Sequence, residues 1–289
     1  MARRQDRGLT QGSSGLMHEV RQVTKHILRG AYGPGRWIAL LWLIVPAVGC
    51  AELGPAEKRM LREADELYRS SDMAGAKARC DRLIQNFPDA AEIAEAHYIR
   101  GLCHAQTREI NAAARDFEAA ARKSRREDLT ALSRASLGSL AYHAGEWDRA
   151  HRNFSEALPA LPATPPKDEL LFTAGLAAQR AGQWDDATRW FREVMHHFGD
   201  RPVAADARRM AQWRHPYFAV QLGVFRDSTN AADLVRRLRD QRIDAVQENM
   251  PRGGEAVWVV MAGRYRTYAE ARRGLESIRQ VQSGAFIIP

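Results

Sequence analysis

Few side chains in this 289-residue chain have the types and spacing that catalysis or metal binding requires. Its cysteines are Cys50, Cys80 and Cys103, too few for a fold built on disulfides. Cys80 and Cys103 are predicted to be buried thiols, with a disulfide in an oxidising compartment as the alternative. His196-His197 is predicted to be a solvated pair, because adjacent helical residues point in different directions. No serine–histidine–acid arrangement stands out, so we predict no catalytic residue, no metal, no cofactor and no enzyme.

Cys50 follows an N-terminal segment with the features of an export signal. Arg29 and Arg36 precede the apolar run 37–45, and small residues separate this run from Cys50. The run is too short to span a bilayer, which needs roughly 20 apolar residues, but it has the length of a signal-peptide core. Ala47-Val48-Gly49-Cys50 resembles the lipobox of bacterial lipoproteins, with Ala47 where leucine is usual. The resemblance implies cleavage before Cys50 and a lipid on its thiol that anchors the chain to a membrane.

The leader therefore comprises a lipoprotein signal peptide at 1–49 and a lipidated tether at 50–54. An uncleaved N-terminal anchor and an ordinary secretory signal are the alternatives, and either Met1 or Met17 is the start. The leader also explains most of the net charge of +8, since residues 1–49 hold seven basic and two acidic residues. The remainder is close to neutral, so the charge gives no reason to expect a nucleic-acid partner.

Residues 55–213 carry a 37-residue repeat that predicts helical hairpins. Small residues and a phenylalanine recur at this period, in the sets Gly101/Gly138/Gly175, Ala113/Ala150/Ala187, Phe117/Phe154/Phe191 and Ala120/Ala157/Val194. A weaker first copy has Ala64, Ala76, Cys80 and Leu83. Small residues suit the places where two helices approach closely, with the aromatic ring between them. The pattern predicts about four helix–turn–helix copies.

These copies resemble tetratricopeptide (TPR) repeats. The resemblance is carried by Leu137-Gly138, Gly145, Trp147, Ala150, Phe154, Ala157 and Pro162, and again by Gly175, Gly182, Trp184, Ala187 and Phe191. The usual aromatic three residues after the early glycine is replaced by His104, Ala141 and Ala178. The resemblance implies an all-α superhelix whose groove holds envelope or divisome proteins. Residues 50–215 carry 25 basic and 25 acidic side chains, so charge does not identify the ligand.

From Pro216 onward, strand and helix patterns alternate. Phe218–Phe225 and 258–265 are predicted strands of the same form, 40 residues apart. Asp227 or Ser228 is predicted to cap one helix, and Thr267-Tyr268-Ala269-Glu270 is a capping box for another. Shorter strands are predicted at 245–248 and 285–288, with a turn at 251–254. The resulting order βαββαβ is that of a small α+β, RNP-like split βαβ domain at 216–289.

This module resembles the SPOR family, small domains that bind septal peptidoglycan glycan strands stripped of their peptides. The resemblance is carried by Val220-Gln221-Leu222-Gly223-Val224-Phe225, by Asn230-Ala231, and by Trp258-Val259-Val260-Met261-Ala262-Gly263-Arg264-Tyr265. It implies that Gln221 is the glutamine that contacts the glycan. The family's aromatic and basic residues on the third strand fall on Val257 and Val259, and Trp258 is predicted by parity to point inward.

Strand alternation predicts which side chains face away from the helices: Ala219, Gln221 and Gly223, with Val257, Val259 and Met261. We expect this face to be open, flat, largely apolar and uncharged, which suits the C–H face of a sugar ring. Arginines at its rim are predicted to meet the lactyl carboxylates of muramic acid. The predicted glycan-binding residues are therefore Gln221, Val257, Val259, Met261, Arg226, Arg264 and Arg266.

Two functions fit this organisation. The first is an exported, membrane-anchored lipoprotein that faces the periplasm, is enriched at the division septum, binds peptidoglycan glycan strands and scaffolds partners on its repeats. The second is an envelope-assembly scaffold lipoprotein whose C-terminal module packs on the repeats or binds another protein.

Overall fold

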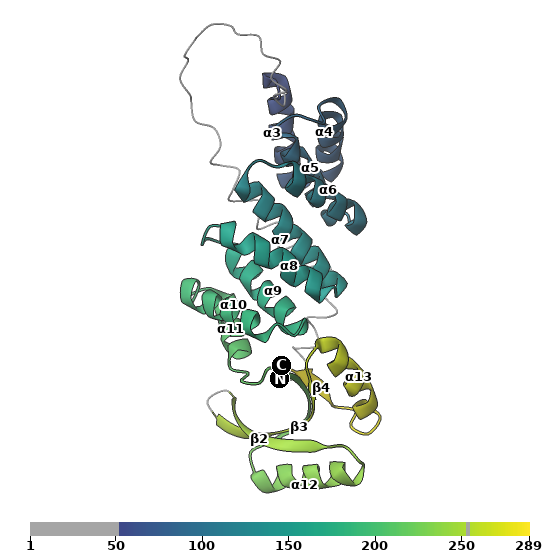
Figure 1. Cartoon of the computed structure of the whole chain (residues 1–289), viewed down its shortest axis with the longest axis vertical. Helices are drawn as coiled ribbons and strands as arrows, with labels where there is room; N and C mark the ends of the chain where they lie inside the picture. The colour runs from purple at the N-terminus through teal and green to yellow at the C-terminus, as the bar shows by residue number, and fades with distance from the viewer. Residues whose placement is uncertain (1–51, 253–254) are drawn as a thin grey trace. The chain divides into compact units, whose positions relative to one another are not determined.

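The computed structural model describes residues 52–252 and 255–289, so the predicted lipidation residue, Cys50, lies outside the described residues. The chain forms a helical body followed by a small α/β domain (Figure 1). It divides into two compact units whose boundary falls inside one helix, between Thr173 and Ala174. Within the part of the chain that the structure describes, no helix has the length and apolar character needed to cross a bilayer.

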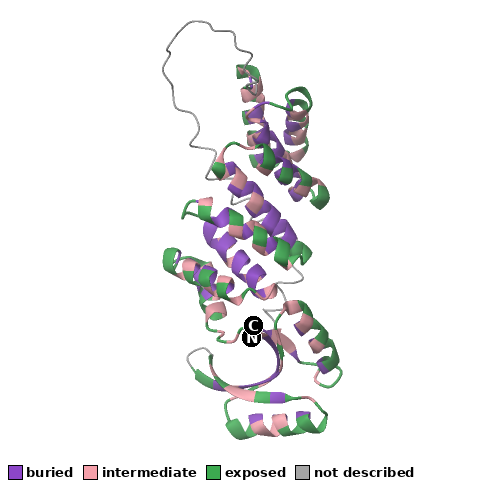
Figure 2. Cartoon of the chain, viewed as in Figure 1, coloured by how far each residue is buried: buried purple, intermediate pink, exposed green. Residues whose placement is uncertain are grey.

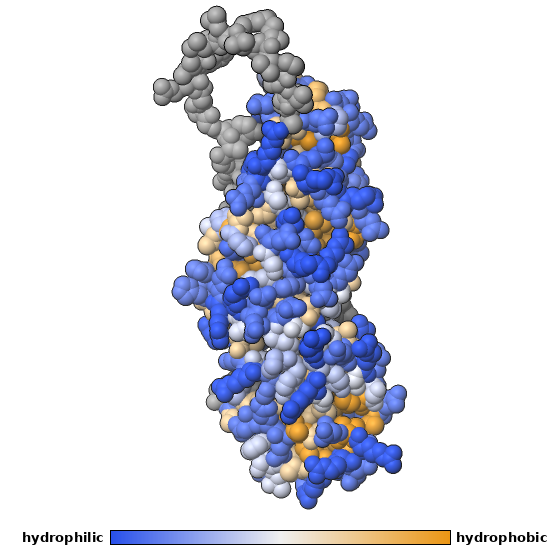
Figure 3. All heavy atoms as spheres, in the orientation of Figure 1, coloured by the Kyte–Doolittle hydropathy of each residue, from blue (hydrophilic) through white to orange (hydrophobic). Residues whose placement is uncertain are grey.

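The first unit is built from helices. They are α3 (Pro55–Arg69), α4 (Met73–Asn86), α5 (Ile93–Gln106), α6 (Ile110–Lys123), α7 (Glu127–Ala144) and α8 (Trp147–Ala157), followed by the short 3-10 helix η3 (Leu158–Ala160) and the start of α9 (Lys167–Arg180). Of these, α3 to α8 each pack against the next one along the chain. Their buried sides face one another (Figure 2). Apolar residues reach the visible surface of the chain mainly as small patches among hydrophilic ones (Figure 3).

The 37-residue glycine–phenylalanine repeat has a direct structural counterpart. A Cβ atom on Gly101 would lie 2.8 Å from the ring of Phe117, and one on Gly138 would lie 3.0 Å from the ring of Phe154. Both rings are fully buried. Glycine is therefore required because the ring from the second helix of each pair lies against the backbone of the first, as the sequence predicts.

The turn between the helices of each pair repeats as well. Ser71, Arg108, Gly145 and Gly182 have φ angles of 70°, 63°, 78° and 79°, and they are spaced 37 residues apart. A left-handed residue at this point reverses the chain direction after the first helix. Glycine adopts this conformation without strain, whereas Ser71 and Arg108 carry a cost of about 1 kcal/mol each. This periodicity includes the weak first copy and confirms that the body consists of repeated hairpins.

The second unit contains the end of α9, two further helices and the α/β domain. Its elements are α10 (Trp184–His197), α11 (Pro202–Ala211), β1 (Phe218–Phe225), α12 (Ser228–Asp240), β2 (Ala245–Arg252), β3 (Glu255–Tyr265), α13 (Tyr268–Arg279) and β4 (Phe286–Ile288). The Trp184 indole packs against Phe218 with ring centroids 4.8 Å apart, and its N–H donates to the carbonyl of Arg266 at 3.3 Å. These contacts connect α10 to β1 and to the residue that follows β3.

The predicted βαββαβ order is confirmed, and the strands form one antiparallel sheet in the order β2-β3-β1-β4. Asp227 caps α12, and Thr267 with Glu270 forms the predicted capping box of α13. The predicted end of β2 was wrong, because the strand continues through Pro251 to Arg252 and pairs with the start of β3. Proline is tolerated there because β2 lies at the edge of the sheet.

Candidate functional site

The sheet of the α/β domain has two differently covered faces. Helices α12 and α13 pack on one face, where Val220, Leu222, Val260 and Ala262 join helix residues in a buried cluster. Trp258 packs against this cluster, as its parity predicts. A second cluster lies on the opposite face and contains Ala219, Val257, Val259, Met261 and Ile288. We call this second surface the far face of the sheet.

The strand register brings most of the predicted glycan-binding floor together on the far face. Gln221 on β1 lies opposite Met261 on β3, and Val224 lies opposite Val259. A shift of register between Gln221 and Gly223 changes the alternation of β1, which places Val224 on this face instead of the expected Gly223. The sequence pattern could not show this bulge, because strict alternation assumes an unbroken ladder.

The expectation that the far face is open was wrong for its predicted binding residues, whereas Val224 on the same face is 40% exposed. The exposed fractions of Gln221, Val257, Val259 and Met261 are 5%, 8%, 0% and 1%. A ligand on the surface of the described structure therefore does not reach them. The partly buried residues Trp213, Tyr217, Met250 and Phe286 pack against this cluster, the last two from strands of the sheet itself.

Much of this cover comes from residues 213–217, between α11 and β1, which we call the strap. Trp213, His215 and Tyr217 are half-buried, whereas Arg214 and Pro216 between them are exposed. Because of this alternation, every second side chain of the strap points towards the sheet. The His215 and Tyr217 rings are stacked at 20° with centroids 4.9 Å apart, and the Trp213 ring meets each of them edge-on.

Two side-chain contacts link the strap to the sheet. Nε2 of His215 lies 3.0 Å from both carboxylate oxygens of Glu248 on β2. The guanidinium of Arg264 on β3 lies 5.7 Å from the centre of the Tyr217 ring, within the range of a cation–π interaction. The indole N–H of Trp213 donates to the carbonyl of Tyr217 at 2.8 Å, inside the strap itself. The strap was not predicted from the sequence, although the spacing of its three aromatic rings resembles that of a strand.

The three predicted rim arginines lie at two opposite ends of the central strand pair. Phe218 pairs with Tyr265 and Phe225 pairs with Trp258, so Arg226 follows one end of the pair while Arg264 and Arg266 lie at the other. These ends are about 23 Å apart for an extended chain. Arg226 forms an exposed ion pair with Glu255 at 3.1 Å, and Arg266 is also exposed. Arg264 and Arg266 therefore offer positive charge at one end of the far face, whereas Glu255 balances the charge of Arg226 at the other.

Comparison with protein-family models gives a match over the same segment. Residues 215–289 match the model described as "SPOR domain". This chain contains a SPOR domain. The match covers the four-stranded sheet, its two helices and the part of the strap from His215 onward. A SPOR domain is a binding domain and suggests peptidoglycan as the ligand. No curated protein matches the chain.

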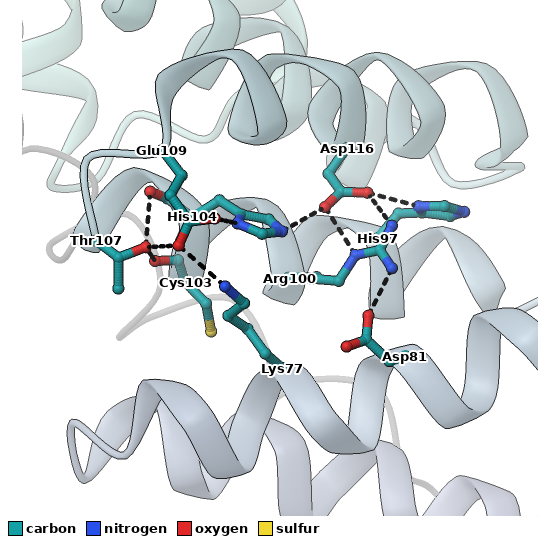
Figure 4. A network of polar contacts seen from close by, with 9 residues as sticks. All are labelled: Lys77, Asp81, His97, Arg100, Cys103, His104, Thr107, Glu109 and Asp116. Atoms are coloured by element: carbon teal, nitrogen blue, oxygen red, sulfur yellow. Dashed lines mark hydrogen bonds and ion pairs between the residues drawn. The ribbon is translucent and has the colours of Figure 1, made fainter.

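A polar cluster lies in the helical body, between α4, α5 and α6 (Figure 4). Asp116 is 4% exposed, and its carboxylate accepts from Nδ1 of His97 at 3.0 Å. It also accepts from two guanidinium nitrogens of Arg100, at 2.8 Å and 2.6 Å. A third nitrogen of Arg100 donates to Asp81 on α4, so this arginine ties three helices together. We call this cluster the polar seam.

At the positions of Arg100 and Asp116 in the polar seam, the later repeats have mostly apolar side chains. Residues 37 and 74 positions after Arg100 are Leu137 and Ala174, and those after Asp116 are Asn153 and Trp190. Burial raises the pKa of the Asp116 carboxyl, but the hydrogen bonds from His97 and Arg100 outweigh this effect and hold the pKa below its usual value. The donors satisfy the carboxylate within the protein, so the seam holds helices together rather than presenting an unfilled site.

The polar seam continues towards the surface at the turn after α5. His104 lies with Nε2 3.7 Å from Asp116 and Nδ1 2.9 Å from Glu109. Glu109 also accepts from Thr107 and Lys77, and these hydrogen bonds lower its pKa to about 2, with the bond from Thr107 contributing most. The sequence analysis named His104 only as the replacement for an aromatic. Comparing the repeat copies position by position would have revealed the polar run.

The remaining chemical candidates have plain structural roles. Cys80 and Cys103 are buried free thiols, as predicted, and burial raises the pKa of both. His196 and His197 are exposed, as predicted, with their rings in edge-on contact. Among the described residues, no group of three or more His, Cys, Asp or Glu side chains is placed to hold a metal ion.

Proposed function

We propose that this chain is a cell-envelope protein whose SPOR domain binds peptidoglycan glycan strands that lack stem peptides. The family match at residues 215–289 carries the proposal. The chemistry of the far face supports it, because an apolar floor that also carries the amide side chain of Gln221 suits the C–H faces and hydroxyl groups of sugars.

Each of the predicted glycan-binding residues has a defined role in this proposal. Val257, Val259 and Met261 supply the apolar floor, and Gln221 supplies hydrogen bonds to hydroxyl groups. Arg226 lies at one end, and Arg264 and Arg266 at the other, where they meet the lactyl carboxylates of muramic acid. A linear glycan strand then runs parallel to β1 and β3 rather than across them, because only this direction connects both groups of arginines.

The rest of the chain positions this domain in our proposal. Lipid on Cys50 anchors the protein to a membrane facing the periplasm, and TPR-like repeats hold envelope or divisome partners at the septum. Left-handed turns and glycine–phenylalanine contacts at a 37-residue period support a stacked repeat array as the scaffold. The anchored end and the wall-binding end then bridge the membrane and the cell wall.

Co-sedimentation of the full-length protein with purified peptidoglycan tests the glycan-binding function. Pre-treatment of the peptidoglycan with an amidase, which removes the stem peptides, is expected to increase the bound fraction. Gln221→Ala is expected to weaken binding, whereas Gln241→Ala, at the exposed end of α12, is expected to leave it unchanged. Equal binding to treated and untreated peptidoglycan would refute the glycan function.

The alternative is an envelope-assembly scaffold whose C-terminal domain binds protein. The burial of the far face beside aromatic side chains favours this alternative, since apolar surfaces that pack against protein are buried in the same way. A fluorescent fusion of the protein separates the two functions in cells. Glycan binding predicts that mid-cell enrichment depends on the SPOR domain, whereas a protein scaffold predicts that it depends on the repeats.

A further inference from the structure

We propose that the strap, residues 213–217, is a built-in competitor that occupies the far face and must leave it before a glycan strand reaches Gln221. This inference rests on the proposed glycan-binding function. It assigns to the segment before β1 a regulatory role that lowers the apparent affinity of the domain for its ligand.

The burial of the far face requires such a movement. Val259 and Met261 are as inaccessible as Val220 and Val260, which form the core under the helices. A sugar ring that contacts the side chain of Gln221 therefore needs the space that cover residues now fill. Of these residues, Phe286 and Met250 belong to strands of the sheet, whereas Trp213 and Tyr217 belong to the strap.

The strap is held in a way that permits release. Pairing of β1 with its neighbours starts at Phe218 and Ala219, after the strap has ended, so lifting the strap breaks no rung of the ladder. The contact between His215 and Glu248, which links the strap to the sheet, is only partly buried, with exposed fractions of 26% for His215 and 38% for Glu248. Pairs this exposed contribute little to stability. Stacking of half-buried aromatic rings supplies the remaining stabilisation of the strap on the sheet.

The strap and the proposed ligand need the same groups. Aromatic rings cover the apolar floor that the C–H faces of sugars would cover. The guanidinium of Arg264 lies against the Tyr217 ring, so this arginine is engaged by the strap at the position where it would meet a lactyl carboxylate. Both cannot occupy the far face at once, and binding is therefore coupled to strap release. If only a fraction of the molecules has the strap released, the apparent dissociation constant rises by the inverse of that fraction.

Variants that loosen the strap test this competition in the full-length protein. The probe is soluble glycan strands freed of stem peptides by an amidase. Tyr217→Ala removes the stacked ring and the contact with Arg264, and we expect it to tighten glycan binding by about tenfold. Glu248→Gln weakens the contact with His215 while preserving the fold, and we expect about twofold tighter binding. Arg214→Ala, on the outward side of the strap, is the matched control and should bind like the wild type.

Weaker or unchanged binding by both Tyr217→Ala and Glu248→Gln would overturn the competition, even if the wild type binds glycan well. Failure of the wild type and both variants to bind would instead refute the glycan function itself. Circular dichroism shows whether each variant is folded. If Tyr217→Ala does not fold, the binding measured for Glu248→Gln decides the outcome.

Limited proteolysis of the wild type provides an independent readout. Trypsin cleavage after Arg214, which lies within the strap, is expected to accelerate when soluble glycan strands are added, because release exposes the backbone of the strap. Cleavage after Arg242, in the exposed turn after α12, provides the internal control. Unchanged or slower cleavage after Arg214 in the presence of bound glycan would overturn the proposal.

Discussion

The polar seam and the strap both use a histidine and a carboxylate, but they enclose them differently. In the seam, the side chains of His97 and Asp116 are 11% and 6% exposed, and helices hold them from both sides. In the strap, those of His215 and Glu248 are 26% and 38% exposed, on a segment that lies on one surface. The same chemistry is therefore permanent in one place and releasable in the other. Enclosure, rather than residue type, separates a structural contact from a regulatory one.

Removing the centre of the seam should have the largest effect. Asp116→Ala leaves the charge of Arg100 without its main buried partner, and we expect the first unit to lose about 3 kcal/mol of its free energy of unfolding. Urea unfolding followed by circular dichroism measures this loss.

The matched control for that substitution is Asn153→Ala, at the equivalent position one repeat later. The side chain of Asn153 donates an exposed hydrogen bond to the carbonyl of Arg149, so the expected loss is below about 1 kcal/mol. Equal losses for the two variants would contradict the special role of the seam. Glycan binding should not change in either variant, because both substitutions lie in the first unit.

The seam should also make the first unit sensitive to acid. In the folded protein, the pKa of the Asp116 carboxyl is lower than its ordinary value. A carboxyl with a lowered folded pKa adds stability that is fully present above its unfolded pKa and is lost as the pH falls through its folded pKa. At pH values below about 4, the urea concentration at the unfolding midpoint should therefore decrease more steeply with falling pH for the wild type than for Asp116→Asn. Parallel pH profiles for both proteins would count against this contribution.

A substitution beside the seam separates its contribution from that of the neighbouring turn. Arg108 has a φ of 63° where the later copies have Gly145 and Gly182. Arg108→Gly relieves the left-handed strain without touching the hydrogen bonds of Asp116, so we expect a gain of about 0.5–1 kcal/mol in the free energy of unfolding. Thermal denaturation measures the gain, and Gly145→Ala should show the opposite sign. A loss of stability in Arg108→Gly would show that its side chain contributes more than the turn costs.

Loosening the strap should have the smallest effect on stability. Glu248→Gln is expected to change the free energy of unfolding of the second unit by less than about 0.5 kcal/mol, because the pair with His215 is half-exposed. Thermal denaturation of the variant and of the wild type gives the difference. A loss comparable to that of Asp116→Ala would mean that the strap is a structural element like the seam, and that the contrast between the two regions does not hold.

The sequence was most informative where one period governs the structure. The 37-residue spacing locates the glycine–phenylalanine contacts, and alternation along β3 correctly separates Trp258 from Val259. Both patterns work because they depend on residues close together in the chain or on exact copies. They could be predicted without knowing how distant segments meet.

The features that the sequence did not reveal depend on tertiary contacts between segments that are far apart in the chain. The cover over Val259 comes partly from Trp213, and the partner of His215 is Glu248, 33 residues away. The shift of register in β1 depends on its pairing with β3 and moves Val224 onto the far face. Periodicity identifies which side of a strand a residue occupies, but it does not state what covers that side.

Equilibrium binding of the full-length protein to soluble glycan strands decides whether the SPOR domain recognises glycan that lacks stem peptides. Isothermal titration calorimetry with strands freed of stem peptides is compared with strands of the same length that retain them. Our account predicts saturable binding to the peptide-free strands, weakened by Gln221→Ala and much weaker for strands with peptides. Absence of heat with both ligands, or equal affinity for both, would contradict it.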